Sequence, residues 1–335
     1  MKSLFRVLLP WTIWAYLLLL LGCQIAQLTP LNQLWPLQLI ITFKVWLYLP
    51  LVILIPFCLL YIRKRVALLL LITLLWFSWD YGWCLLPHWT IGPMPLRVMS
   101  WNIRYDNPSP EVIGQTILAQ QPDVVALQAL MNPNAQALAV LLQSRYPHQA
   151  FSTTAGLGIF SRYPLTPIQP SPAAIGSRYQ QVTITPPEAT ETPRSALPQQ
   201  FTLINVHLPT PSISISRLAS IPIPTNFFTT KQNRHLAQLL QQMQTVSQPL
   251  LVMGDFNIGD RQPNYQRLRA QLGDAFYGVG WGLGLSYPVN RLPPFPLVRI
   301  DYLFHSSQWQ PQRIWQGQRT GSDHKYLVAE LRPAG

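Results

Sequence analysis

The sequence of 335 residues has few cysteines and few charged residues. Its three cysteines, Cys23, Cys58 and Cys84, all lie within the first 90 residues. Residues 91–335 therefore contain no thiol that could form a disulfide or act as a catalytic nucleophile. This part of the chain is long enough for its hydrophobic core alone to stabilise it.

Charged residues make up only 11% of the sequence. Residues 1–96 hold six Lys or Arg and one acid, Asp80, whereas residues 97–335 hold eighteen Lys or Arg and eleven acids. The net charges of the two parts are +5 and +7, which together give the +12 of the whole chain. The basic residues of the second part form no Lys/Arg cluster, so the electrostatic signal for nucleic-acid binding is modest.

Long apolar runs are concentrated in the first 90 residues. They extend from Leu8 to Ala26, from Leu37 to Ile62 and from Val66 to Pro87. A helix needs about 20 apolar residues to cross a bilayer. The sequence therefore predicts a membrane anchor with three transmembrane helices over residues 1–90. A signal peptide is the alternative for the first run, although two more runs follow it and no small-residue cleavage site stands out.

The basic residues around these runs predict an orientation. Lys2 and Arg6 precede the first run, and Arg63–Arg65 separate the second from the third. Because cytoplasmic loops carry an excess of Lys and Arg, the N-terminus is expected in the cytoplasm. Three crossings would then place residues 91–335 on the non-cytoplasmic side. We expect a multi-pass membrane protein with the lipid bilayer as its partner and no obligate protein partner.

Residues 91–335 have the pattern of a separate α/β domain. Alternating or short apolar runs predict strands, and longer periodic segments predict helices. The expected strands are 96–103, 123–127, 158–162, 180–184, 201–207, 249–253, 299–304 and 325–331, and the expected helices are 111–120, 134–144 and 226–246. This order suggests two mixed sheets packed face to face with helices outside. The segment Pro209–Thr225 is expected to form a surface loop near the mouth of the site.

Polar residues stand at the ends of two of these expected strands. Gly254-Asp255-Phe256-Asn257 closes the apolar run 249–253, and Gly321-Ser322-Asp323-His324 opens the run 325–329. Two Asp, an Asn and a His gathered at strand ends can hold a hard divalent cation and activate a water molecule beside it. This set of residues predicts metal-assisted hydrolysis at phosphorus.

Seven motifs in chain order resemble those of the endonuclease/exonuclease/phosphatase superfamily, which includes DNase I-like nucleases, neutral sphingomyelinases and inositol polyphosphate 5-phosphatases. They are SWNIRYDN (100–107), PDVVALQ (122–128), GIFSRYPL (158–165), NVH (205–207), GDFN (254–257), RIDY (299–302) and SDH (322–324). The similarity covers about residues 97–332. It implies a four-layered α/β sandwich and a Mg²⁺-dependent (or Mn²⁺-dependent) attack of water on a phosphate ester.

The resemblance assigns expected roles to individual residues. Asn102, Asp323 and Asp255 are the expected metal-binding residues, since Mg²⁺ prefers oxygen ligands. Asp255 is also expected to accept a proton from the attacking water, and Asn257 to hold water or phosphate without adding charge. His324 is expected to contact a phosphoryl oxygen or to act as an acid or base.

Four further residues complete the expected site. Asp301 is expected to fix the tautomer of the catalytic imidazole through its second ring nitrogen. His207, at the end of its strand, is expected to donate to phosphate or to assist the leaving group. Arg104 and Arg162 are the candidate phosphate-binding residues. The substrate is left open among nucleic acid, phospholipid and small phosphoesters.

One position departs from the pattern of the superfamily. After Leu127-Gln128 the family has a metal-binding Glu, and this chain has Ala129. Gln128 is a poor replacement because neighbouring residues on a strand point to opposite faces. Asp106 and Glu111 are the nearest carboxylates that follow in the chain. The alternative to an enzyme is therefore a catalytically weak or inactive module that binds a phosphate ligand.

Overall fold

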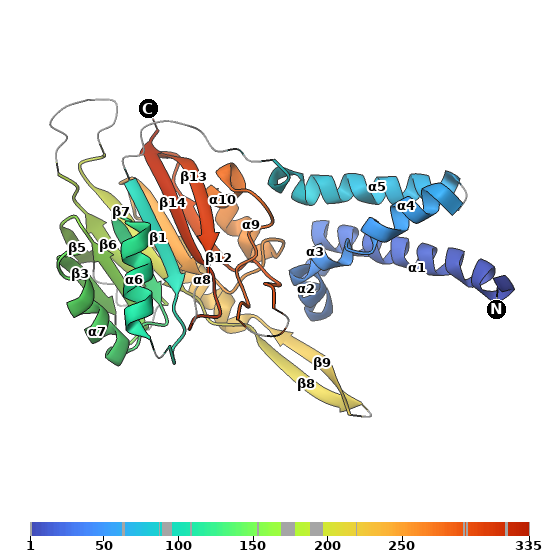
Figure 1. Ribbon diagram of the computed structural model, residues 1–335, viewed down its shortest axis with the longest axis horizontal. Helices are drawn as coiled ribbons and strands as arrows, with labels where there is room; N and C mark the ends of the chain where they lie inside the picture. Colours follow the sequence, from blue (N-terminus) through green and yellow to red (C-terminus); the bar gives the residue numbers. More distant parts are fainter. Residues whose placement is uncertain are drawn as a thin grey trace.

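The structure is a computed structural model of the chain. It describes residues 2–61, 64–86, 88, 96–107, 109–152, 154–168, 178–187, 197–218, 220–290, 292, 294–318 and 321–334. An N-terminal group of helices precedes a β-sandwich with helices on its outer faces (Figure 1).

The N-terminal part consists of helices that extend away from the sandwich (Figure 1). They are α1 (Lys2–Leu28), the short 3₁₀ helix η1 (Pro30–Gln33), α2 (Trp35–Thr42), α3 (Lys44–Leu47), α4 (Leu51–Tyr61), α5 (Lys64–Tyr81) and the 3₁₀ helix η2 (Gly82–Cys84). Among the described residues, one helix segment, Trp11–Leu28 of α1, is long and apolar enough to cross a membrane. A second would exist only if the bent pair Trp35–Thr42 and Lys44–Pro56 were counted as one span.

The prediction of three transmembrane helices is therefore wrong, and the multi-pass topology and the predicted side of the membrane lose their support. The second apolar run does not form one helix, because the chain bends by 75° between Thr42 and Lys44. Pro50, which has no backbone N–H, then precedes α4. The third run forms α5, whose 18 residues include Lys64, Arg65 and Asp80.

Two six-stranded mixed sheets form the sandwich. The first has the strand order β13-β14-β1-β2-β4-β3 and the second the order β11-β12-β10-β7-β6-β5. The pairs β1–β2 and β7–β10 are parallel, and the other pairs are antiparallel. The strands are β1 (Leu96–Asn102), β2 (Val124–Gln128), β3 (His148–Ser152), β4 (Leu157–Ser161), β5 (Leu165–Ile168), β6 (Tyr179–Ile184), β7 (Phe201–His207), β10 (Leu250–Asp255), β11 (Gly273–Asp274), β12 (Asp301–His305), β13 (Trp309–Gly317) and β14 (Tyr326–Pro333).

Alternation along the strands divides the buried side chains among three clusters. Val98 of β1 and Leu203 of β7 belong to the cluster between the sheets, whereas the neighbouring Met99 belongs to a cluster that includes residues of α6 (Pro110–Gln120) and α7 (Asn132–Leu142). The third cluster joins Val252 of β10 to residues of α8 (Thr230–Met243) and α9 (Pro263–Arg269). The short helix α10 (Ala275–Val279) lies against β12 and β13. The predicted α/β fold of two mixed sheets flanked by helices is confirmed.

The segment that follows β7 forms a hairpin that projects from the sandwich (Figure 1). It consists of β8 (Ser212–Leu218) and β9 (Ile221–Phe228), which pair only with each other among the described strands. The segment Pro209–Thr225, expected as a surface loop, is indeed exposed, but most of it forms strands instead of a loop. Pro222 and Pro224 disfavour a central strand, but a proline is tolerated in a strand with a free edge.

The N-terminal helices contact the sandwich through polar side chains. Trp46 Nε1 donates to Leu297 O at 2.8 Å, and Gln262 Nε2 donates to Thr42 Oγ1 at 2.7 Å. A buried ion pair joins Lys44 Nζ to Asp80 Oδ2 at 2.6 Å. Arg261 of the sandwich donates to the carbonyl oxygen of Asp80. The loop that follows Asn257 is thus held against the helices.

Candidate active site

Strand register brings three acidic or imidazole side chains to one end of the second sheet. In β10, Asp255 pairs with His207 of the parallel strand β7 and with Asp301 of the antiparallel strand β12. The last residue of β10 therefore lies between the last residue of β7 and the first of β12. The opposing sheet contributes Asn102 from the end of β1.

The Asp255 carboxylate is the centre of this cluster and is almost completely buried. Asn102 Nδ2 donates to its Oδ2 at 2.9 Å. The backbone N–H of Asn257 donates to its Oδ1 at 2.9 Å, and Asn257 Nδ2 lies 3.3 Å from Oδ2. Asn257 has a φ of 52°, a left-handed conformation that Asn tolerates better than most residues. The two asparagines therefore orient the carboxylate without adding charge.

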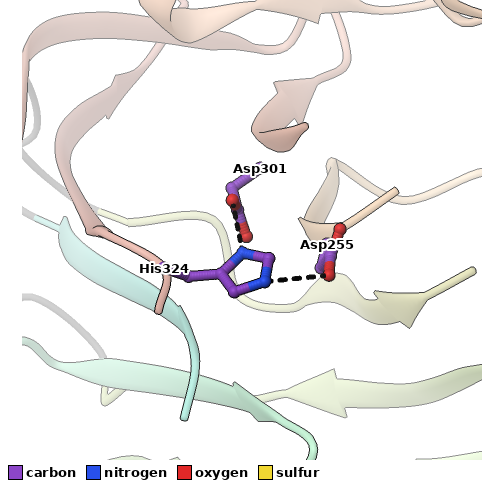
Figure 2. Close-up of side chains that lie close together, drawn as sticks. All are labelled: Asp255, Asp301 and His324. Atoms are coloured by element: carbon purple, nitrogen blue, oxygen red, sulfur yellow. Dashed lines mark hydrogen bonds and ion pairs between the residues drawn. The ribbon is translucent and has the colours of Figure 1, made fainter. Parts of the chain in front are cut away.

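His324 joins the two carboxylates (Figure 2). Its Nδ1 lies 2.9 Å from Asp301 Oδ2, and its Nε2 lies 3.8 Å from Asp255 Oδ2. The loop that carries it is fixed by Ser322, whose Oγ donates to Asn102 O at 2.7 Å and accepts from the His324 N–H at 3.0 Å. The Tyr287 ring lies against the imidazole, with 4.6 Å between the ring centroids.

Burial and neighbouring charges shift the pKa values of His324 and Asp255. Burial lowers the pKa of His324, but the charges of Asp301 and Asp255 outweigh it and raise the pKa to about 9. Burial is the main cause that raises the pKa of Asp255 to about 7, against the charge of His324. At neutral pH His324 is therefore an imidazolium, and Asp255 exchanges its proton easily.

His207 differs from His324 in its charge state. Its Nε2 lies 3.7 Å from Asp255 Oδ2, and its ring stacks on that of Tyr105 with 5.8 Å between centroids. Burial, followed by the positive charges of His324 and Arg178, lowers its pKa to about 4. Its buried Nδ1 has no hydrogen-bond partner among the residues that the structure describes. His207 is thus a neutral imidazole at neutral pH.

The cluster contains a group that fits a divalent cation. Asp255, Asp301 and His324 each offer one ligand atom, and these atoms lie within 4.8 Å of one another. The carboxylate oxygens suit hard cations such as Mg²⁺ and Mn²⁺, whereas His324 could join them only after losing its Nε2 proton. The expected set of Asn102, Asp255 and Asp323 overlaps with this group only at Asp255. The structure brings Asn102 into contact with Asp255 and buries Asp323 beside His324.

The two candidate phosphate-binding arginines have different positions. Arg104 is close to the cluster, since its N–H donates to Asn102 Oδ1 at 3.0 Å, but its side chain pairs with Asp106 at 2.5 Å. Arg162 follows β4, which is antiparallel to β2, and its partner Asp123 precedes β2. Arg162 therefore lies at the end of the sheet opposite to Gln128 and Asn102, and the prediction that places it in the site is wrong.

The sequence analysis missed Arg178, which lies beside the site. Its carbonyl oxygen accepts from the His207 N–H at 2.9 Å, and its charge contributes to the lowered pKa of His207. Arg178 immediately precedes β6, which is antiparallel to β7. The start of β6 therefore lies beside the end of β7. This neighbour relation depends on the sheet order, which no local motif shows.

Ala129, which follows β2, stands at the position of the family's Glu and supplies no carboxylate. Ala129 is buried and has a φ of 57°. Gln128 cannot replace the Glu because its Nε2 donates to Asn205 Oδ1 at 2.8 Å, in a contact that links the two sheets. Asp106 is exposed and paired with Arg104, and Glu111 is exposed at the start of α6. Neither belongs to the buried acidic group.

A two-sheet α/β sandwich with an Asp-His-Asp cluster at one end of its strands defines the class of this protein. The sequence pattern of the Endonuclease/Exonuclease/phosphatase family matches residues 99–324, and the chain belongs to this family. No curated protein matches the sequence.

Solved structures share the fold at low sequence identity. An endonuclease/exonuclease/phosphatase from Bacteroides vulgatus is 18% identical, with a TM-score of 0.50 over 71% of this chain and 99% of that one. The human Nocturnin catalytic domain is 18% identical, with a TM-score of 0.51 over 73% of this chain and 97% of that one. A functionally unknown conserved protein from Enterococcus faecalis is 16% identical, with a TM-score of 0.51 over 71% and 100%.

Proposed function

We propose that this protein is a membrane-anchored, divalent-metal-dependent hydrolase of phosphate esters. Family membership supports phosphoester hydrolysis in general terms. The observation that carries the proposal is the buried chain of contacts from Asp301 through His324 to Asp255, with Asn102 on the same carboxylate. Residues 91–335 form the proposed catalytic domain, and residues 1–90 the proposed anchor.

The proposed metal is Mg²⁺ or Mn²⁺, held by Asp255 and Asn102 with Asp323 nearby. When bound, it supplies positive charge to the phosphate and lowers the pKa of a water molecule. Asp255 accepts a proton from the attacking water. Asn257 fixes the direction of this carboxylate through its backbone N–H.

The histidines act on the phosphate in different ways. His324, kept protonated by Asp301, presents Nε2–H to a phosphoryl oxygen where negative charge grows in the transition state. His207, which is neutral, donates from its ring to a phosphate oxygen or to the leaving group. Arg178 adds positive charge beside His207 and replaces Arg162 as the candidate phosphate contact.

The proposed anchor is helix α1. Its segment Trp11–Leu28 is apolar, and only one third of that segment is buried inside the protein. Large apolar side chains are also exposed on the other helices, including Val52 and Ile53 of α4 and Trp79 of α5. An apolar surface of this extent is unfavourable in water and favours contact with lipid. A signal sequence is the alternative for α1.

The test of the proposed reaction is hydrolysis of bis-p-nitrophenyl phosphate by the purified full chain. We expect p-nitrophenol release with Mg²⁺ or Mn²⁺, loss of release with a chelator, and loss in Asp255→Asn, which keeps the shape of the side chain. The matched control is Glu111→Gln, an exposed carboxylate at the start of α6. Equal rates for Asp255→Asn and the parent chain would contradict the proposal.

A second candidate function is a phosphate-binding module without turnover. Ala129 favours it, because a carboxylate that binds metal in the family is missing here. Calorimetric titration with inorganic phosphate distinguishes the two functions. Binding of phosphate, together with no hydrolysis by either the parent chain or Ala129→Glu, would identify a binding module.

A further inference from the structure

The β8–β9 hairpin exposes an unusual amount of apolar surface for a water-soluble segment. Ile215, Leu218 and Ile221 are 62%, 68% and 64% exposed. Ile213, Ile223 and Phe228 are also exposed. Leu218 and Ile221 are paired across the two strands near the tip. Apolar groups gathered on a projecting element indicate a surface that meets another apolar phase.

The hairpin begins close to the candidate active site. Only residues 208–211 separate His207 from the start of β8. At its other end, β9 leads into α8, whose Gln232 donates to Asn257 O at 2.7 Å. The base of the hairpin also lies against α2 of the N-terminal part. The hairpin therefore begins and ends at the side of the site that His207 occupies.

A second exposed apolar segment lies on the side of the site that His324 occupies. Tyr287 packs against His324, and Asn290 Nδ2 donates to Ser322 O at 2.9 Å. The same connection exposes three large apolar residues, which are Trp281, Leu292 and Phe295. Phe295 contacts Trp46 of α3, with 5.4 Å between ring centroids. Both segments that carry exposed apolar residues therefore adjoin the candidate site along the chain, and both contact the N-terminal helices.

The position and charge of the hairpin favour a lipid surface as its partner. Figure 1 shows it leaving the sandwich towards the side where α1, α4 and α5 lie, away from α6 and α7. No Asp or Glu occurs between residues 197 and 254, where Arg217, Lys231 and Arg234 are the basic residues. The hairpin itself carries one basic residue, Arg217, beside its apolar side chains, and Lys231 and Arg234 follow in α8, which suits the interface of a bilayer that contains anionic lipids.

Backbone chemistry limits the other possible partners. Each strand of an isolated hairpin has one free edge, and a second copy of the chain could extend the sheet there. Pro222 and Pro224 lack N–H groups, so β9 is a poor template for another strand. The free edges also limit insertion to the headgroup boundary, because unsatisfied backbone groups are costly in the hydrocarbon core.

We propose that the β8–β9 hairpin, together with Trp281, Leu292 and Phe295, docks the catalytic domain on the bilayer surface. In this position the site takes the headgroup phosphodiester of a membrane phospholipid as its substrate. The docking surface rests on the exposed residues and on the proposed anchor, not on the proposed hydrolysis. The substrate class rests on the proposed hydrolase function. Hydrolysis of this substrate breaks a P–O bond, and water supplies the hydroxyl group to phosphorus and the proton to the leaving alcohol.

The docking is tested with tryptophan as a depth probe. The full chain is reconstituted in vesicles of phosphatidylcholine and phosphatidylglycerol, with or without brominated acyl chains. Because the chain has 12 tryptophans, the quenching of each variant is compared with that of the parent. We expect additional quenching in Leu218→Trp and none in Val140→Trp, an exposed control on α7. Equal quenching in both variants would overturn the docking.

The substrate class is tested with Leu218→Ser/Ile221→Ser. Loss of two apolar contacts is expected to lower hydrolysis of vesicle phospholipid about tenfold. Hydrolysis of soluble bis-p-nitrophenyl phosphate is expected to stay at the parent rate, as both activities do in the control Val140→Ser. Equal losses on both substrates would show a structural role for the hairpin and contradict the inference.

The two proposals fail in different ways. If the parent chain hydrolyses neither substrate, the proposed function is wrong, while the quenching result still decides the docking. If the parent hydrolyses the soluble ester but no phospholipid, the substrate class is overturned. If Leu218→Ser/Ile221→Ser changes the oligomeric state in detergent and Leu218→Trp shows no additional quenching, the hairpin docks on a second copy instead.

Discussion

Asp301→Asn tests whether the charge of His324 matters for the reaction. The Asp301 carboxylate lies 2.9 Å from His324 Nδ1 and is the largest of the causes that raise the pKa of His324 to about 9. The shift from the ordinary value of 6.5 corresponds to about 3 kcal/mol of preference for the imidazolium. Asp255 also raises this pKa and burial opposes both carboxylates, so we take about 2 kcal/mol, which is about 1.5 pKa units, for Asp301. We therefore expect little loss of kcat/KM at pH 6 and about a tenfold loss at pH 9, where His324 of the variant has lost its proton.

The pH profile of kcat/KM gives the sharper measurement, because it reports titrating groups of the free enzyme. In the parent chain, His324 loses its proton as the pH rises through about 9. Without the Asp301 charge, burial lowers the pKa of His324, and the alkaline limb moves to lower pH. The loss of activity is therefore greater at pH 8 than at pH 6.

Controls separate this effect from a loss of structure. Glu111→Gln removes an exposed carboxylate at the start of α6 and is expected to keep the parent profile. Asp301→Glu retains the charge and is expected to restore part of the alkaline limb. Thermal unfolding shows whether Asp301→Asn is folded. A folded Asp301→Asn variant with its alkaline limb still near pH 9 would refute the assigned role of the carboxylate.

Three further predictions concern other parts of the chain. Ala129→Glu restores a carboxylate beside the cluster and is expected to lower the Mg²⁺ concentration for half-maximal activity about tenfold, as a metal titration would show. Arg162→Ala breaks a partly exposed pair with Asp123 and is expected to leave kcat/KM unchanged and to cost less than about 1 kcal/mol in denaturant unfolding. Asp80→Ala leaves Lys44 buried without its charge partner and is expected to cost about 3–5 kcal/mol, seen as a lower Tm in detergent, with partial recovery in Lys44→Leu/Asp80→Leu.

The sequence predicted the sandwich well because local patterns determine its strands. The segment 201–207 was expected as a strand and forms β7, and the run 249–253 forms most of β10. Polar residues that directly follow or precede such runs had to lie at strand ends, so Asp255 and His324 could be identified before their contacts were known. Asp255 and His324 come close to each other because the strand ends that carry them lie at the same end of the fold.

The sequence failed where the outcome depended on neighbours in space. Arg162 belongs to a motif that resembles the family, but the antiparallel direction of β4 places it at the far end of the sheet. Arg178 was missed for the opposite reason, since only the pairing of β6 with β7 brings it beside His207. Hydropathy predicted a span through Lys44, whereas a bend and the partner Asp80 create a buried ion pair there.

The absence of a carboxylate at position 129 affects how a metal ion would bind beside Asp255. Four residues surround the Asp255 side chain, which are Asn102, Asn257, His207 and His324. All of them except His324 are neutral at pH 7. A metal would therefore meet less negative charge here than in a site that has the Glu, and its binding would depend more strongly on the ionisation of Asp255. Because the pKa of Asp255 is raised to about 7, metal affinity in the parent chain should rise steeply between pH 6 and pH 8. Ala129→Glu supplies a second anionic ligand and should flatten this dependence, so a metal titration that is equally steep in both chains would show that Asp255 is not the main metal ligand.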